Sequence, residues 1–383
     1  MKYRILYLAV LFLPVAASAQ SVRVQDTIRF EVVQDKIIIP ATLGGRPTRF
    51  IIDTGGRNLI TRDSAEYHNV EPGGRQLVSD VNSGGVSMLT AQAKDLQLSD
   101  NIRLTTTPML VTAPNKFFRT LGVAGLLGSE AFSKVCLTID KRAGYIVMSY
   151  PYGPRGLSKD DAISIPPHDY SHPYIPVRIG EKEIYVLFDT GMSGFLSLTG
   201  DDHRKLAGDP AVSVDNEGYG FLNVGIGGIR TAKAERLERV RLARLSFGGK
   251  RFENAVSTSQ NLGGNSIMGL ELLDHGRIVL DYPRSRVYFL PYDDSVADMK
   301  ESTKIWNVKI LPIVDHFEVT AVFGDAGVGF GERVWAIGDT QLEGAELSEL
   351  YITELMDSVA GDTCDITVGE EKSSLRKVTI RKL

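Results

Sequence analysis

The stretch IIIPATLGGRPTRFIIDTG at residues 37–55 has a counterpart, YIPVRIGEKEIYVLFDTG, at residues 174–191. Each stretch has a strand-like run, a short turn (Gly44-Gly45 or Gly180-Glu181) and a second apolar run that ends in Asp-Thr-Gly. Glycine at a two-residue connection between apolar runs is typical of a β-hairpin. The chain is therefore predicted to build the same hairpin twice, with an aspartate at the end of its second strand.

The similarity between the two halves continues beyond the hairpins. Gly-Leu-Leu-Gly at 125–128 matches Ser-Ile-Met-Gly at 266–269, and the strand-like pattern at 137–148 matches the one at 278–290. The step is 136 residues from Asp53 to Asp189 and 141 from Gly128 to Gly269. Three landmarks in one order at nearly one offset indicate an internal duplication.

Length and composition exclude several classes of protein. The chain has 383 residues, which is more than one ordinary domain contains. It is 43% hydrophobic and 23% charged, which excludes a disordered chain and a polytopic membrane protein. The net charge of -4 argues against a nucleic-acid partner. Two cysteines, Cys136 and Cys364, exclude a disulfide scaffold and are expected to be buried free thiols.

The N-terminus has the pattern of an export signal. Lys2 and Arg4 precede an almost wholly apolar run at 5–15, and Ala17-Ser18-Ala19 follows. This order predicts a signal peptide over residues 1–19 that is cleaved after Ala19. The alternative is a membrane anchor, but the run is short for a bilayer. We therefore expect a periplasmic or secreted protein without a stable membrane anchor.

A glycine-rich segment follows each Asp-Thr-Gly. One includes Gly84 and Gly85, and the other includes Gly225, Gly227 and Gly228. Alternating strand-like residues follow each segment, so both are predicted to be hairpin tips. A tip of this kind can fold over a bound ligand, although an ordinary surface hairpin has the same pattern.

The two Asp-Thr-Gly copies carry the chemistry. A single copy is more often a turn than a site. Here each copy follows an apolar run that predicts a buried strand. Burying an aspartate at the end of such a strand costs free energy unless its carboxyl group is hydrogen-bonded. The next two residues can provide those bonds, because glycine lets a backbone N–H approach and threonine has a hydroxyl. Two carboxylates brought together would share one proton, which favours general acid–base chemistry.

Taken together, the two halves resemble the aspartic protease superfamily. Each half looks like one retropepsin subunit, and the resemblance covers about residues 20–292. It implies a mainly β fold with two β-barrel lobes, at 20–150 and 151–292. It also implies catalytic roles for Asp53 and Asp189, and a substrate cleft covered by the two glycine-rich flaps. The implied supporting residues are Thr54, Gly55, Thr190 and Gly191.

The resemblance further implies an endopeptidase that acts on peptide or protein substrates without a metal or cofactor. Both aspartates belong to one chain, so a dimer is not required for the active site. The six histidines show no metal-binding spacing, which agrees with this expectation.

The residue after each Asp-Thr-Gly departs from the family pattern. Gly56 and Met192 stand where related enzymes usually have serine or alanine. Without a hydroxyl there, the pair is expected to keep its shared proton to a higher pH, which predicts an optimum of about pH 5 to 7. The alternative is a non-catalytic peptide-binding protein that keeps the protease fold.

The pattern changes after a polar stretch at 292–303. Residues 331–339, GERVWAIGD, resemble a turn of PDZ domains, and helical spacing at 347–359 followed by two strand-like runs fits the same resemblance. It implies an α+β PDZ-like domain at 304–383 that binds an extended peptide as an added strand. His316 and Phe317 would line its groove. The alternative is a small packing domain whose groove is occluded.

Overall fold

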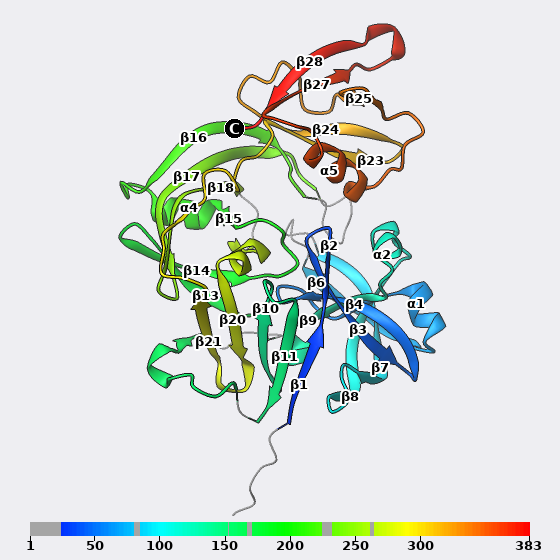
Figure 1. Cartoon of the computed structure of the whole chain (residues 1–383). Helices are drawn as coiled ribbons and strands as arrows, with labels where there is room; N and C mark the ends of the chain where they lie inside the picture. The colour runs from blue at the N-terminus through cyan, green and yellow to red at the C-terminus, as the bar shows by residue number, and fades with distance from the viewer. Residues whose placement is uncertain (1–23, 80–84, 152, 167–170, 224–231, 261–263) are drawn as a thin grey trace, which may run out of the picture.

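The computed structural model describes residues 24–79, 85–151, 153–166, 171–223, 232–260 and 264–383. The fold is mainly β, as the sequence predicted, and its strands form three sheets (Figure 1). The predicted signal peptide at 1–19 lies outside the described residues.

The first repeat forms an eight-stranded sheet in which a strand from late in its sequence lies between two strands from early in its sequence. Strand β9 lies between β4 and β5, and it runs parallel to β4 and antiparallel to β5. An additional pairing of β3 with β7 curls the sheet on itself. In sheet order the strands are β2 (Glu31–Val33), β3 (Lys36–Leu43), β4 (Arg46–Asp53), β9 (Gly125–Gly128), β5 (Leu59–Thr61), β8 (Arg103–Thr112), β7 (Gly85–Gln97) and β6 (Pro72–Ser79).

The second repeat has the same strand order. Its β19 again lies between the two strands that flank Asp-Thr-Gly, and β13 pairs with β17 as β3 pairs with β7. The register repeats as well, since Ile38 lies opposite Ile51 and Tyr174 lies opposite Leu187. In sheet order the strands are β13 (Tyr174–Ile179), β14 (Lys182–Phe188), β19 (Ile267–Met268), β15 (Leu196–Thr199), β18 (Lys250–Gln260), β17 (Glu235–Phe247) and β16 (Val212–Gly220).

A third sheet is shared by the two repeats. Its central strands β10 and β20 come from different repeats and pair with Leu137 opposite Leu280. In sheet order the strands are β1 (Val24–Arg29), β11 (Tyr145–Tyr150), β10 (Cys136–Asp140), β20 (Gly276–Asp281), β21 (Arg286–Pro291) and β12 (Ile163–Ser164). One apolar core includes buried residues of both repeats, among them Phe50 and Phe188.

The helices are short and follow strands at matching places in the repeats. Helix α1 (Arg62–Tyr67) begins after Thr61, whose hydroxyl accepts from a backbone N–H of its first turn, and α4 (Gly200–Leu206) begins after Thr199 in the same way. The other helices are α2 (Lys116–Leu121), α3 (Ser129–Phe132), α5 (Glu349–Asp357) and the 3-10 turns η1 (Lys159–Asp161), η4 (Leu270–Asp274), η5 (Tyr282–Arg284) and η6 (Lys372–Ser374). Within the described ranges, no helix is both long and apolar enough to cross a membrane.

The C-terminal segment, residues 304–383, adds an α+β unit with its own apolar core, in which α5 packs against the sheet. The sequence predicted its strands and helix closely. The strands are β23 (Val308–Ile313), β24 (His316–Phe323), β25 (Arg333–Ile337), β26 (Thr340–Gln341), β27 (Thr363–Val368) and β28 (Arg376–Arg381).

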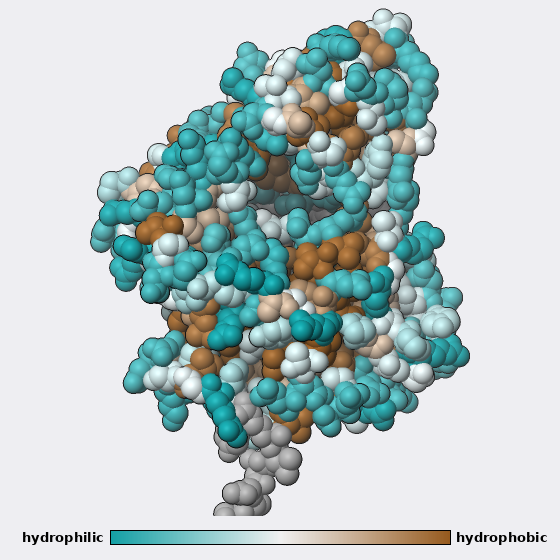
Figure 2. Space-filling view, viewed as in Figure 1, coloured by the Kyte–Doolittle hydropathy of each residue, from teal (hydrophilic) through white to brown (hydrophobic). Residues whose placement is uncertain are grey.

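This segment is joined to both repeats. Strand β24 pairs with β16, so the sheet of the second repeat continues into the C-terminal segment. On the other side, Glu346 forms an ion pair with Lys116 of the first repeat at 3.2 Å, and Leu350 packs against apolar residues of that repeat. Figure 2 shows a hollow on this face beneath the C-terminal segment, with apolar residues below it.

The polar stretch at 292–303 is packed against the second repeat. Its short strand β22 (Ala297–Asp298) pairs with β18, and Met299 is buried in the main core. The predicted boundaries of the three domains stay predictions. Cys136 and Cys364 are both buried, and no disulfide bond joins them in the described part of the chain.

Candidate active site

The two predicted aspartates follow equivalent buried strands. Ile51 and Ile52 are buried before Asp53, and Leu187 and Phe188 are buried before Asp189. In each repeat the neighbouring parallel strand fixes the strand end, since Asp53 lies opposite Gly128 and the N–H of Asp189 donates to the carbonyl of Met268 at 2.9 Å. The apolar run thus anchors each aspartate where its strand leaves the sheet.

The threonines that follow the aspartates interlock. The Thr54 hydroxyl accepts from the N–H of Thr190 at 3.1 Å and donates to the carbonyl of Phe188 at 2.8 Å. The Thr190 hydroxyl accepts from the N–H of Thr54 at 3.1 Å and donates to the carbonyl of Ile52 at 2.8 Å. Both threonines are fully buried. These four bonds hold the two Asp-Thr-Gly loops in one symmetrical arrangement.

The glycines of the two loops allow the aspartates to approach. A Cβ added to Gly55 would lie 2.3 Å from Cγ of Asp189, and one added to Gly191 would lie 2.8 Å from Cγ of Asp53. No side chain fits at such distances without displacing the carboxyl. Asp-Thr-Gly therefore needs its glycine because the opposite carboxyl occupies that space.

The second glycine motif of each repeat has a similar reason. A Cβ on Gly128 would lie 2.2 Å from the carbonyl oxygen of Gly56, and a Cβ on Gly269 would lie 2.1 Å from that of Gly194. Both positions face backbone, which cannot move aside as a flexible side chain can. The two glycines thus let the chain after Asp-Thr-Gly pack directly on the neighbouring strand.

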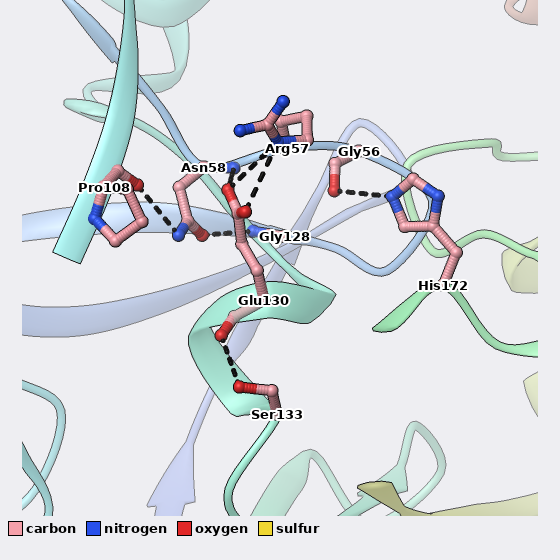
Figure 3. Close-up of polar contacts among 8 residues, drawn as sticks. All are labelled: Gly56, Arg57, Asn58, Pro108, Gly128, Glu130, Ser133 and His172. Atoms are coloured by element: carbon pink, nitrogen blue, oxygen red, sulfur yellow. Dashed lines mark hydrogen bonds and ion pairs between the residues drawn. The ribbon is translucent and has the colours of Figure 1, made fainter. Parts of the chain in front are cut away.

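A polar network supports the first loop (Figure 3). The Asn58 side chain accepts from the N–H of Gly128 at 2.9 Å and donates to the carbonyl of Pro108 at 3.1 Å. Glu130 accepts from the N–H of Asn58 at 3.0 Å and forms an ion pair with Arg57 at 3.3 Å. The charge of Arg57 is therefore directed towards Glu130, which explains why this residue can follow the motif.

The two carboxyls have different surroundings. Oδ1 of Asp189 accepts from the N–H groups of Gly191 at 2.7 Å and Gly55 at 3.3 Å. Oδ1 of Asp53 is buried and has no hydrogen-bond partner within the described part of the chain. Burial, the charge of Asp189 and a hydrogen bond between the two carboxyls hold the pKa of Asp53 well above its usual value. The raised pKa favours the protonated form of Asp53.

The glycine at position 56 fits the space beside Asp53. A Cβ there would lie 2.7 Å from Oδ2 of Asp53, so the carboxyl occupies the place that a larger residue would take. On the other side, the Ser193 hydroxyl accepts from the Lys36 ammonium at 2.9 Å. Sequence reasoning missed Lys36, because a single lysine before an apolar strand has no pattern that marks it.

The structure tests the predicted flap glycines and the predicted groove residues only in part. Gly85 is exposed at the start of β7, while Gly84, Gly225, Gly227 and Gly228 lie outside the described residues, so the flaps stay a prediction. Phe317 is 1% exposed, and its ring lies 6.1 Å from that of Tyr351 on α5. It packs in the core of the C-terminal segment instead of facing an open groove. His316 is half-buried and contacts Asp315 and Glu318.

Across the described ranges, no group of three or more histidine, cysteine, aspartate or glutamate side chains is placed to hold a metal ion. Two surface pockets, of about 250 and 670 Å³, lie at α4 and at α1, and neither is lined by an Asp-Thr-Gly residue.

Comparison with known proteins gives one family match. Residues 39–131 match the family model described as "Aspartyl protease", which includes the first Asp-Thr-Gly and Gly-Leu-Leu-Gly. This match supports a protease-like function for that part of the chain. No curated protein matches.

The solved structures that are similar to this chain include two aspartic proteases. The aspartic proteinase from Irpex lacteus is 13% identical, with 70% of this chain and 97% of that chain covered and a TM-score of 0.43. A retropepsin-like aspartic protease from Rickettsia conorii is also 13% identical, with 33% of this chain and 92% of that chain covered and a TM-score of 0.25.

Proposed function

We propose that this chain is an exported aspartic endopeptidase in which Asp53 and Asp189 hydrolyse peptide bonds with an activated water. The observation that carries the proposal is the interlocked pair of Asp-Thr-Gly loops, which brings the two carboxyls close enough for each to affect the other and for the pKa of Asp53 to lie well above its usual value. A protein that only binds peptides has no need of such a pair, since two neighbouring carboxyls are costly to bury.

The reaction follows from the different protonation of the two groups. The ionised carboxyl of the pair accepts a proton from a bound water, and the protonated carboxyl, a role that fits the raised pKa of Asp53, donates its proton to the carbonyl oxygen of the peptide bond. The water oxygen adds to the carbonyl carbon, and the tetrahedral diol collapses to a carboxylic acid and an amine. As the C–N bond of the diol breaks, the carboxyl that took the proton from water gives it to the leaving nitrogen, and the other carboxyl takes a proton from a diol hydroxyl. Both carboxyls then have their starting protonation, and no covalent enzyme intermediate forms.

The remaining parts of the chain have proposed roles that follow from the resemblances. Residues 1–19 direct export, and the glycine-rich segments cover the bound peptide. The C-terminal segment is proposed to bind an extended peptide as a PDZ-like module, at a surface that does not include the buried Phe317. Both aspartates belong to one chain, so the active protein is expected to act without dimerisation.

Digestion of a peptide library tests the proposal. The full chain should cleave peptides, pepstatin should inhibit it, and Asp53→Asn and Asp189→Asn should each abolish cleavage, because the pair acts as a unit. Asp294→Asn is a matched control, since Asp294 is exposed and distant in sequence from both motifs. Peptide binding without cleavage by the wild-type chain would instead favour a non-catalytic binding protein.

A further inference from the structure

A basic residue reaches across the pseudo-symmetrical site from each repeat. The Lys36 ammonium donates to the carbonyl of Gly191 at 2.8 Å and to the Ser193 hydroxyl at 2.9 Å, so a side chain of the first repeat binds the loop of the second. His172 of the second repeat lies with Nε2 3.4 Å from the carbonyl oxygen of Gly56 in the first (Figure 3).

These two residues occupy the same place in their repeats. Opposite residues in β3–β4 and β13–β14 are related by a step of 136, as Ile38 and Ile51 are to Tyr174 and Leu187. The same step relates Lys36 to His172. The fold therefore directs the residue at this equivalent position of each repeat onto the opposite loop, and of the two residues only Lys36 has a long cationic side chain.

The backbone fixes the direction of Lys36. A tight turn at Gln34 and Asp35, both with positive φ, ends immediately before it. Ile37, Ile38 and Ile39 then begin the buried part of β3. Because the turn and the strand leave little freedom between them, Lys36 starts from a defined position at the edge of the site.

Asp53 and Asp189 are called the dyad below. Among the described basic side chains near the dyad, Lys36 is its main cationic neighbour. Arg57 is paired with Glu130, and His172 makes the longer contact with Gly56. Burial lowers the pKa of Lys36, and the nearby negative charges of Asp53 and Asp189 oppose that effect, as Asp35 and Glu349 of α5 do more weakly. The lysine and the two aspartates are thus close enough to influence one another.

We propose that Lys36 is a positioning residue of the dyad, which holds the second Asp-Thr-Gly loop from the first repeat and stabilises the single negative charge that the two aspartates share. This inference rests on the proposed function and adds a group that the two motifs do not contain. It offers a replacement for the hydroxyl that is missing at positions 56 and 192.

The pH profile of kcat/KM for peptide cleavage tests the proposal. Lys36→Gln keeps an amide donor for the loop but removes the charge, whereas Lys36→Arg keeps the charge. Loss of a positive charge disfavours both ionisations of the pair, so we expect Lys36→Gln to move both limbs of the profile to higher pH by about one unit. Lys36→Arg should keep the wild-type midpoints, and so should the control Lys94→Gln, which changes an exposed lysine on β7.

A merely structural role gives a different result. If Lys36→Gln lowers kcat/KM by the same factor at every pH, or if Lys36→Arg shifts the limbs as much as Lys36→Gln does, the proposed electrostatic role is wrong. Thermal melting of each variant shows whether it is folded at the pH values used.

A measurement on the folded wild-type chain does not depend on cleavage or on the glutamine variant. Lysine side chains labelled with ¹³C and ¹⁵N give one signal that disappears in Lys36→Arg and so identifies Lys36. We expect this signal to move with pH as the two aspartates titrate, and the movement should vanish when Asp53→Asn and Asp189→Asn are combined. No movement would overturn the inference. A wild-type chain that cleaves nothing would instead refute the proposed function, and this titration would still report the coupling.

Discussion

Replacing Thr54 with valine tests the interlocked loops directly. Valine has nearly the shape of threonine but cannot accept from the N–H of Thr190 or donate to the carbonyl of Phe188. Both of these backbone groups then lack a partner in a fully buried place. Each unsatisfied group costs about 1 to 3 kcal/mol, so for the two groups we expect Thr54→Val to lower the free energy of unfolding by about 2 to 6 kcal/mol.

Urea unfolding measures this loss through the midpoint, provided that the slope with denaturant is unchanged. Thr54→Ser keeps the hydroxyl and should recover most of the stability, and Thr106→Val changes an exposed threonine on β8 as a control. We also expect a loss of about a hundredfold in kcat/KM for Thr54→Val, because small displacements of reacting groups are costly. If the valine variant unfolds and cleaves like the wild type, the two loops are held by something other than these hydroxyls.

Three further predictions follow from the site and its surroundings. Folded Asp53 keeps its proton at pH values where the unfolded chain has released it, so stability falls as pH rises above about 4, and Asp53→Asn should raise the melting temperature more at pH 7 than at pH 4. Gly56→Ala places a Cβ 2.7 Å from Oδ2 of Asp53, and we expect kcat to fall at least about tenfold while the chain stays folded. A chain that ends at Asp298 loses the buried Met299, so urea should unfold it at about 2 to 5 kcal/mol lower stability than a chain that ends at Lys304.

Opposite results would contradict these predictions. An equal rise in melting temperature at both pH values would remove the reason to place the shared proton on Asp53. For position 56, Gly73→Ala is the control, because the nearest atom to its added Cβ is 3.7 Å away. Equal stability of the two shortened chains would mean that the stretch after Asp298 contributes little to the main core.

The sequence predicted the parts of the site that depend on local pattern. Each aspartate follows an apolar run, and such a run forms a buried strand wherever it pairs. The supporting role of Thr54 and Thr190 was implied by the resemblance to aspartic proteases, and in the structure their hydroxyls bond to the opposite loops. The strands of the C-terminal segment were also predicted, because each has a local pattern of strand-forming residues. The pairing of β24 with β16 was not predicted, because pairing between distant strands has no local signal in the sequence.

The groups that the sequence did not reveal act over longer distances. Lys36 lies in one repeat and contacts the other, and no spacing within a single motif records such a contact. Phe317 was expected in a groove because strand alternation does not say which side of a strand a helix will cover. In the structure α5 covers that side, and Phe317 is buried beneath Tyr351.

The sheet shared by the two repeats has a consequence for the order of folding. Strand β10 pairs on one edge with its neighbour in sequence, β11, but on its other edge with β20, so this sheet is complete only when residues 278–281 are in place. Pairing over so long a separation is slow, because a large loop must close before any contact stabilises it. We expect the two aspartates to meet only after most of the chain has folded, so a growing or partly folded chain has no assembled dyad. Proteolytic activity would then emerge late, when the segments it could attack are already protected by structure.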